Sequence, residues 1–178
     1  MTKYAIYDVP GYHLTAQHIF NTILAHIREQ GRPAFGPAPM FDEDRDDDPR
    51  LAGKDRCLYR TPDGRSCAFG GIIPDQLYHI SMENQTSSTL IEHHCSYLYF
   101  LLNHIKLIRD CQQAHDIAAK GTNGPARSDD TAYDHMPFMV RFEANMAGVA
   151  VNHRLTYIPY GIPIVGADLP IPALLDYK

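Results

Sequence analysis

The sequence predicts an α+β fold that is mainly helical, with about three main helices, one β-hairpin and an extended proline-rich C-terminal tail. Three observations lead to this prediction. Apolar residues repeat at helical spacing in three separate stretches. A Thr-Pro-Asp-Gly turn joins two short runs of strand-forming residues within residues 57–68. Four prolines interrupt residues 154–178, which rules out a helix or a central strand there.

The first predicted helix covers residues 15–30. The Thr15 hydroxyl can cap its first turn, and Gly31 can adopt the left-handed conformation that ends a helix. At 100° per residue, its large apolar side chains gather on one face. They are Ile19, Phe20, Ile23, Leu24 and Ile27. The pattern is typical of an amphipathic helix on a domain core.

An acidic segment at residues 37–55 follows this helix. Six acidic residues lie between Asp42 and Asp48, where they repel each other and bury no apolar surface. We therefore expect a mobile surface loop. A calcium-binding loop would need a glycine at its sharp turn and a closing glutamate, and this run has neither.

The predicted hairpin at residues 57–68 depends on its turn residues. Pro62 presets the first inner position of the turn, and Gly64 supplies the positive φ of a bulged turn. Pairing Thr61 with Arg65 would place Tyr59 opposite Cys67. The chain then continues to Asp75, which is expected to cap a short helical turn. Arg60 and Asp75 can form an ion pair that fastens the hairpin to that turn.

Two further helices are predicted. The longer covers residues 91–119 and buries a stripe that includes Leu101, Ile105 and Ile108. A polar loop over residues 121–130 separates it from a third helix, which has Pro137 in its first turn. The residues expected to meet in the core are Ile23, Ile27, Leu101, Ile108, Phe138 and Phe142.

Length and charge limit the possible organisation and partners. A chain of 178 residues fits one globular domain, assigned to residues 1–153, followed by a tail at 154–178. The net charge is −5 and no basic cluster is present, which disfavours nucleic acid as the main partner. No apolar stretch is long enough to span a membrane. The four cysteines, with no secretory signal before them, are expected to be reduced thiols in a cytoplasm.

Three separated blocks resemble a known family, the small uncharacterised proteins of bacteriophages and bacterial mobile elements. In chain order, the blocks are the triplet Gln30-Gly31-Arg32, the string C-L-Y-R-T-P-D-G-R-S-C-A-F-G-G-I-I-P-D, and, as a looser match, Gln112, His115 and Asp116. In that family the middle block reads C-x-Y-R, then a short glycine turn, then C-A-x-G-x-L-I-P-D. The resemblance covers roughly residues 15–120. It implies a phage-derived protein in the cytoplasm of a bacterial host cell, and it brings no activity with it.

The helix at residues 91–119 carries the main candidate for metal chemistry. His104, Cys111 and His115 would lie close together around its axis, and Cys111 and His115 have the i,i+4 spacing of two ligands to one ion. Cys67 could complete a zinc site. Without a CxxC or HxxxH pair, packing in the core is the favoured interpretation, so neither a metal nor another cofactor is expected. A mid-helix, core-facing Cys111 also argues against a nucleophile, and Cys57 and Cys67 are expected to be packed thiols rather than a disulfide.

The sequence favours a binding function over catalysis. It contains no catalytic motif, and its apolar tail would be an exposed patch if it were free in water. We therefore expect a non-catalytic accessory protein that binds a host or phage protein, or forms part of an assembly, through its C-terminal tail. Docking of the tail on its own domain stays open. The alternative function is a small metal-dependent hydrolase or nucleotide-acting enzyme centred on His115 and Asp116. No catalytic residue is assigned, and the candidate binding residues are Tyr59, Arg60, Asp75, His115, Asp116, Tyr157 and Tyr160.

Overall fold

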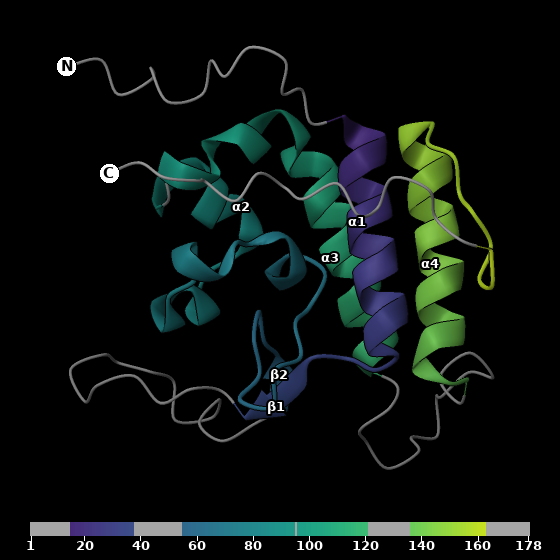
Figure 1. Ribbon diagram of the computed structural model, residues 1–178, viewed down its shortest axis with the longest axis horizontal. Coiled ribbons are helices and arrows are strands. Elements are labelled where there is room, and N and C mark those ends of the chain that lie inside the picture. The colour runs from purple at the N-terminus through teal and green to yellow at the C-terminus, as the bar shows by residue number, and fades with distance from the viewer. Residues whose placement is uncertain (1–14, 38–54, 95, 121–135, 163–178) are drawn as a thin grey trace.

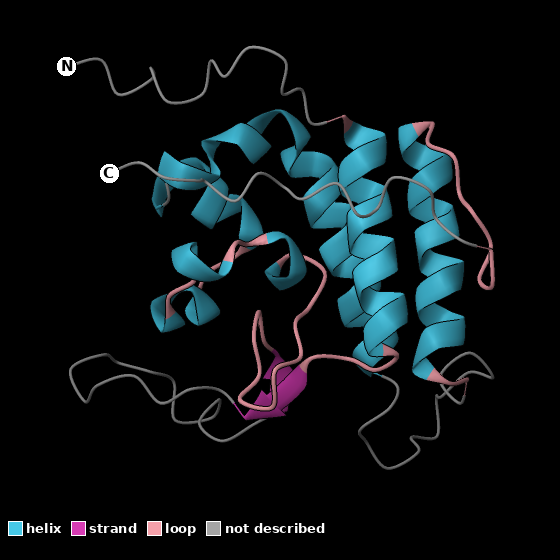
Figure 2. Cartoon of the chain, in the orientation of Figure 1, coloured by secondary structure: helices cyan, strands magenta, loops and turns pink. Residues whose placement is uncertain are grey.

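The computed structural model describes residues 15–37, 55–94, 96–120 and 136–162 (Figure 1). Three α-helices lie side by side: α1 (Ala16–Gln30), α3 (Ile105–Lys120) and α4 (Phe138–His153). Short helical turns flank them on one side, and a small two-stranded sheet lies at one end (Figure 2). The predicted mainly helical α+β fold is confirmed. Most of the acidic segment, the loop at 121–130 and the end of the tail lie outside the described residues.

Helix α1 begins and ends as predicted. The Thr15 hydroxyl accepts a hydrogen bond of 3.1 Å from the His18 amide. Gly31 has a φ of 69° and donates its amide to the Ile27 carbonyl, a conformation that costs glycine little because it has no Cβ. All five predicted apolar side chains of this helix are fully buried.

The sheet pairs strands that the sequence did not suggest. Strand β1 (Phe35–Pro37) runs antiparallel to β2 (Asp55–Cys57). The predicted hairpin at 57–68 is present as a turn with the expected register, since Gly64 has a φ of 83° and Arg60 bridges Ser66. Its ladder is short because the Tyr59 amide donates instead to a buried carboxylate, that of Glu83, which also accepts the Arg60 amide.

Short helical turns lead from the hairpin to α3. They are η1 (Gly70–Ile72), η2 (Asp75–Leu77), η3 (Ile80–Asn84), α2 (Ser87–Thr89), η4 (Leu90–His94) and η5 (Ser96–His104). The prediction that Asp75 caps a turn is wrong. Asp75 is the first residue inside η2, after Pro74, and its carboxylate pairs with Arg60.

The predicted single helix over residues 91–119 is wrong in its first half. The chain is π-helical in η4 and 3₁₀-helical in η5, and regular α-helix begins at Ile105. In a 3₁₀-helix, side chains three positions apart lie directly above one another. Leu98 and Leu101 have this spacing, and both are fully buried. The tighter winding of η5 therefore places two leucines in the core.

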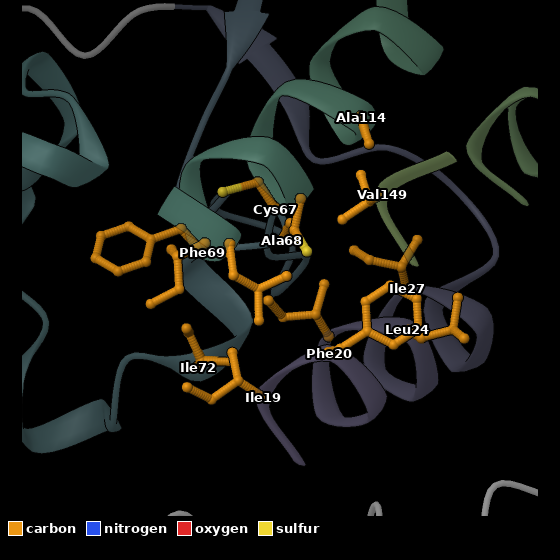
Figure 3. Close-up of a cluster of buried hydrophobic side chains, with 14 of the residues drawn as sticks. Ile19, Phe20, Leu24, Ile27, Cys67, Ala68, Phe69, Ile72, Ala114 and Val149 are labelled. Atoms are coloured by element: carbon orange, nitrogen blue, oxygen red, sulfur yellow. The ribbon is translucent and has the colours of Figure 1, made fainter. Parts of the chain in front are cut away.

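Helix α4 follows Pro137, which occupies the N-cap position and leaves no amide to be satisfied there. Its inner side chains pack with those of α1, α3 and the segment after the hairpin turn, as Figure 3 shows for Leu24, Ala68, Ala114 and Val149. All six predicted core residues are buried, which confirms the predicted helix faces. Within the described ranges, no helix is both long and apolar enough to cross a bilayer.

Candidate functional site

A cleft of about 450 Å³ opens between α3 and the segment around the hairpin. One wall comes from β2, the residue Tyr59 and the stretch from η3 to α2. The other wall is a single face of α3, because its members recur three or four positions apart. The lining residues are Cys57, Tyr59, Glu83, Gln85, Thr86, Ser87, Arg109, Gln112, Gln113, Asp116, Ile117 and Lys120.

A cluster of sulfur, nitrogen and oxygen atoms lies at this cleft. The Nδ1 atom of His115 is 3.3 Å from the Cys57 sulfur and 3.2 Å from a carboxylate oxygen of Asp116. All three atoms lie within 4.8 Å of one another. His115 is fully buried, whereas Cys57 and Asp116 line the cleft. The cluster thus has a buried base and two groups at the cleft surface.

Gln112 orients this cluster. Its side-chain oxygen accepts a hydrogen bond of 2.9 Å from the Phe69 amide, which fixes the direction of the side-chain NH₂ group. That NH₂ group donates to Asp116 at 2.7 Å and to the Cys57 sulfur at 3.5 Å. On its other side, His115 packs edge-on against the Phe138 ring, with ring centroids 5.5 Å apart. The three groups are therefore held by both hydrogen bonding and packing.

The cluster does not have the geometry of a cysteine nucleophile with a catalytic relay. Such a relay uses the two ring nitrogens of histidine separately, one for the nucleophile and one for the carboxylate. Here Cys57 and Asp116 both contact Nδ1. Hydrogen bonding with the Cys67 thiol and burial also raise the pKa of Cys57, which disfavours a reactive thiolate when no metal is bound.

Glu83 anchors the opposite wall of the cleft. Its carboxylate accepts the amides of Tyr59 and Arg60 at 2.7 and 2.8 Å, and the Tyr78 hydroxyl at 2.7 Å. Burying a carboxylate is costly unless it is fully hydrogen-bonded, as it is here. Desolvation and the hydrogen bond to Glu83 raise the pKa of Tyr78, so its hydroxyl stays a donor. Glu83 therefore has a structural role.

The predicted binding residues fall into three separate places. Tyr59 and Asp116 line the cleft, and His115 lies behind them. Arg60 and Asp75 form the predicted ion pair at 2.5 Å, and neither of them lines the cleft. The Arg60 guanidinium also donates to the Ile73 carbonyl and lies over the Tyr78 ring. Its contacts bind the hairpin to the next turns.

The remaining two, Tyr157 and Tyr160, lie on the far side of the domain. The guanidinium carbon of Arg28 is 5.9 Å from the Tyr157 ring centroid and 5.7 Å from that of Tyr160. The Tyr157 hydroxyl donates to Glu143 on α4. Residues 155–160, the first part of the tail, therefore pack on this chain's own helices. Residues 163–178 lie outside the described residues.

The predicted trio of His104, Cys111 and His115 does not come together as one site. Cys111 and His115 are fully buried, but His104 is only half-buried, so its predicted burial is wrong. His104 belongs to the 3₁₀ segment, where the 100° step does not apply. Cys111 packs in the core, where burial raises the pKa of its thiol. This agrees with the interpretation of Cys111 as a packing residue. Among the residues that the structure describes, Cys57, Cys67 and Cys111 are free thiols.

Sequence reasoning missed Cys57, Gln112 and Glu83 as members of the site. One signal was available, because Gln112, His115 and Asp116 have the i, i+3, i+4 spacing of one helix face and occur together in the family-like block. Cys57 and Glu83 carry no such local signal. Their partners come from sequence positions 58 and 24 residues away.

A second feature is the outer face of α4. The exposed residues of this helix carry no charge, and they are Val140, Ala144, Gly148, Val151 and Asn152. The first four lie within about 80° around the helix axis. Val140 is 51% and Val151 77% exposed. A helix that is apolar on both sides normally has a partner on each.

No protein-family model, curated protein or solved structure matches this chain.

Proposed function

We propose that this protein is a non-catalytic, phage-derived accessory protein that assembles with a second copy of itself through the outer face of α4. The observation that carries the proposal is the uncharged, valine-flanked stripe of Val140, Ala144, Gly148 and Val151. Burying a valine side chain contributes on the order of 1.5–3 kcal/mol. Leaving two of them on the water-facing side of one helix favours a partner at that position.

The arrangement of the stripe suits a copy of the same helix. In an antiparallel pair related by a twofold axis, Val140 of one copy lies opposite Val151 of the other. Ala144 then lies opposite Gly148, so the two backbones can approach closely where the helices cross. The exposed face has no charged side chain, so the pairing brings no like charges together.

Light scattering coupled to size-exclusion chromatography, over a range of protein concentrations, tests this assembly. The wild-type chain is expected to be a dimer, and Val151→Asp a monomer, because a carboxylate would be buried without a partner. Asn152→Asp is the matched control. It adds the same charge to the same helical turn, one residue outside the stripe, and is expected to leave the dimer intact. A wild-type monomer at every concentration would reject the proposal.

Assembly through the tail is a competing route. A chain truncated after Ile162 keeps α4 and the described part of the tail, and it removes residues 163–178. It is expected to remain a dimer. If this truncation abolishes the dimer while Val151→Asp leaves it intact, the interface lies in the tail and not on α4.

A further inference from the structure

We propose that Cys57, His115 and Asp116 bind one zinc ion, with the fourth coordination position open to the cleft. This site is independent of the α4 face and goes beyond the proposed assembly. It also replaces the metal-free packing that the sequence favoured for His115. The proposal rests on donor chemistry, on distances and on the residues that orient the donors.

The three donors form a set that zinc accepts. Zinc binds thiolate sulfur, imidazole nitrogen and carboxylate oxygen, and sites with an open position have three protein ligands. A mixed sulfur, nitrogen and oxygen set is less suited to magnesium or calcium, which prefer oxygen ligands alone. The donors come from two elements, β2 and α3, and Cys57 and His115 are 58 residues apart in sequence.

Two of the three donor–donor distances match those around one tetrahedral ion, and the third pair, Cys57 and Asp116, lies within 4.8 Å. Zinc–ligand lengths and the tetrahedral angle place a sulfur and a nitrogen ligand about 3.5 Å apart, and a nitrogen and an oxygen ligand about 3.4 Å apart. The corresponding distances here are 3.3 Å for Cys57 to His115 and 3.2 Å for His115 to Asp116. Small side-chain rotations would therefore suffice to admit the ion.

The donor atoms of Cys57 and Asp116 converge on one nitrogen, the Nδ1 atom of His115. His115 offers Nδ1 to both neighbours, and a neutral imidazole has at most one proton at that nitrogen. The one further donor observed at both Cys57 and Asp116 is the NH₂ group of Gln112. An ion at the centre would accept all three electron pairs at once, and the Cys57 thiol would release its proton to solvent as the ion binds. Gln112 and Phe138 would then be the residues that hold the ligands in position.

The site opens towards the cleft. His115 is fully buried, and the Asp116 side chain is 35% exposed. Cys57 and Asp116 both line the cleft, so an ion between them would face it. Cys67 lies behind Cys57 and is fully buried, with its sulfur accepting the Gly70 amide at 3.3 Å. Zinc bound here would thus retain a position for water or a small ligand.

Metal titration of the full chain tests the site. The purified protein is first stripped with a chelator, and zinc is then added in competition with a chromophoric chelator. One equivalent is expected to bind, and the melting temperature is expected to rise with it. Cobalt(II), used in place of zinc, is expected to give the near-ultraviolet absorption of a cobalt–thiolate bond. Cys57→Ser is expected to remove that absorption and to weaken zinc binding at least tenfold.

Asp116→Asn provides a second variant, chosen because this side chain is partly exposed and its loss should not unfold the domain. It is also expected to weaken zinc binding at least tenfold. Its matched control is Asp110→Asn on the same helix, whose carboxylate contacts His153 and lies outside the cluster. Asp110→Asn is expected to bind zinc like the wild type. Unchanged affinity in both Cys57→Ser and Asp116→Asn, or no binding to the wild-type chain, would overturn the proposal.

Discussion

Arg28 on α1 donates two hydrogen bonds of 2.7 Å to the carboxylate of Glu143 on α4. The two side chains are only 10% and 13% exposed. The same guanidinium donates to the Ile158 carbonyl at 2.6 Å, in the first part of the tail. The hydrogen bonds to Glu143 raise the pKa of Arg28 further, so the guanidinium keeps its charge. One ion pair therefore connects two helices and the chain segment that follows them.

Glu143→Gln is expected to lower the free energy of unfolding by about 3 kcal/mol, because it leaves the Arg28 charge largely buried without its counter-ion. Chemical denaturation measures this loss. The double variant Arg28→Met/Glu143→Met is expected to lose less than the sum of the two single methionine variants, since it removes both charges. A loss below about 0.5 kcal/mol for Glu143→Gln would mean that water compensates for the pair.

Gly70→Ala is expected to destabilise the domain by about 3 kcal/mol, as overpacking against a fixed backbone does. A Cβ at this position would lie 1.9 Å from the Tyr59 carbonyl oxygen. That oxygen also accepts the Cys67 amide, so it cannot move away without loosening the hairpin. Thermal and chemical denaturation provide the measurement.

Gly36→Ala is the control for this substitution. Its added Cβ would meet only a methyl carbon of Leu58, at 3.4 Å, which is ordinary contact. Its stability is expected to stay within about 0.5 kcal/mol of the wild type. Equal effects of the two variants would show that the close approach at Gly70 is easily relieved.

The stability of the domain is expected to fall as the pH drops below 6.5, partly through His26. Burial lowers the pKa of His26 from its ordinary value of 6.5, while its ring contacts the Ser66 carbonyl at 3.3 Å. In the unfolded chain this histidine takes up a proton near pH 6.5, whereas the folded state resists protonation until lower pH. Protons therefore favour unfolding in that interval.

His26→Gln removes the titrating imidazole and keeps a side-chain hydrogen-bond donor. Its free energy of unfolding, measured by denaturant titration from pH 7 downwards, is expected to depend less steeply on pH than that of the wild type. Identical slopes for the two proteins would show that His26 does not contribute.

Local patterns were enough to predict most of the fold. The capping of α1 by Thr15 and Gly31 depends on neighbouring residues only, and so does the turn at Gly64. The helical break before Ile105 was missed because apolar periodicity alone does not distinguish an α-helix from π- and 3₁₀-helical winding over a few turns. Strand β1 was missed because it has only three residues and its partner β2 lies beyond the acidic segment.

The candidate site was predictable only in part, for a related reason. The helix spacing brings Gln112, His115 and Asp116 onto one face, and this could be obtained from the sequence. The same helix also places Cys111 one turn before His115, so Cys111 and Cys57 were alternative sulfur partners for this histidine. Which of them lies beside it depends on the face of α3 that meets the hairpin. That choice depends on Cys57, whose position follows from the pairing of β2 with β1. A long-range contact thus decided which cysteine joins the histidine.

Two truncations distinguish the structural part of the tail from the rest. Leu155 and Tyr157 pack against the core. The Thr156 amide donates to the side-chain oxygen of Gln17 on α1 at 2.7 Å, and the Gln17 side-chain NH₂ group donates to the Thr156 carbonyl at 2.9 Å. A chain ending at Arg154 loses these contacts and leaves Arg28 and Glu143 more exposed to water. We expect it to lose on the order of 2–4 kcal/mol, from two partly buried side chains and their hydrogen bonds.

A chain ending at Ile162 keeps every one of these contacts, so its free energy of unfolding is expected to stay within about 0.5 kcal/mol of the wild type. Both chains are compared by denaturant titration under conditions in which they are monomeric, since assembly would add its own stability. If the chain ending at Arg154 is as stable as the chain ending at Ile162, the packing of residues 155–160 contributes nothing to the domain. Residues 155–160 would then be able to leave their own helices and pack on those of another molecule. In that case the tail, rather than α4, would be the preferred route to assembly.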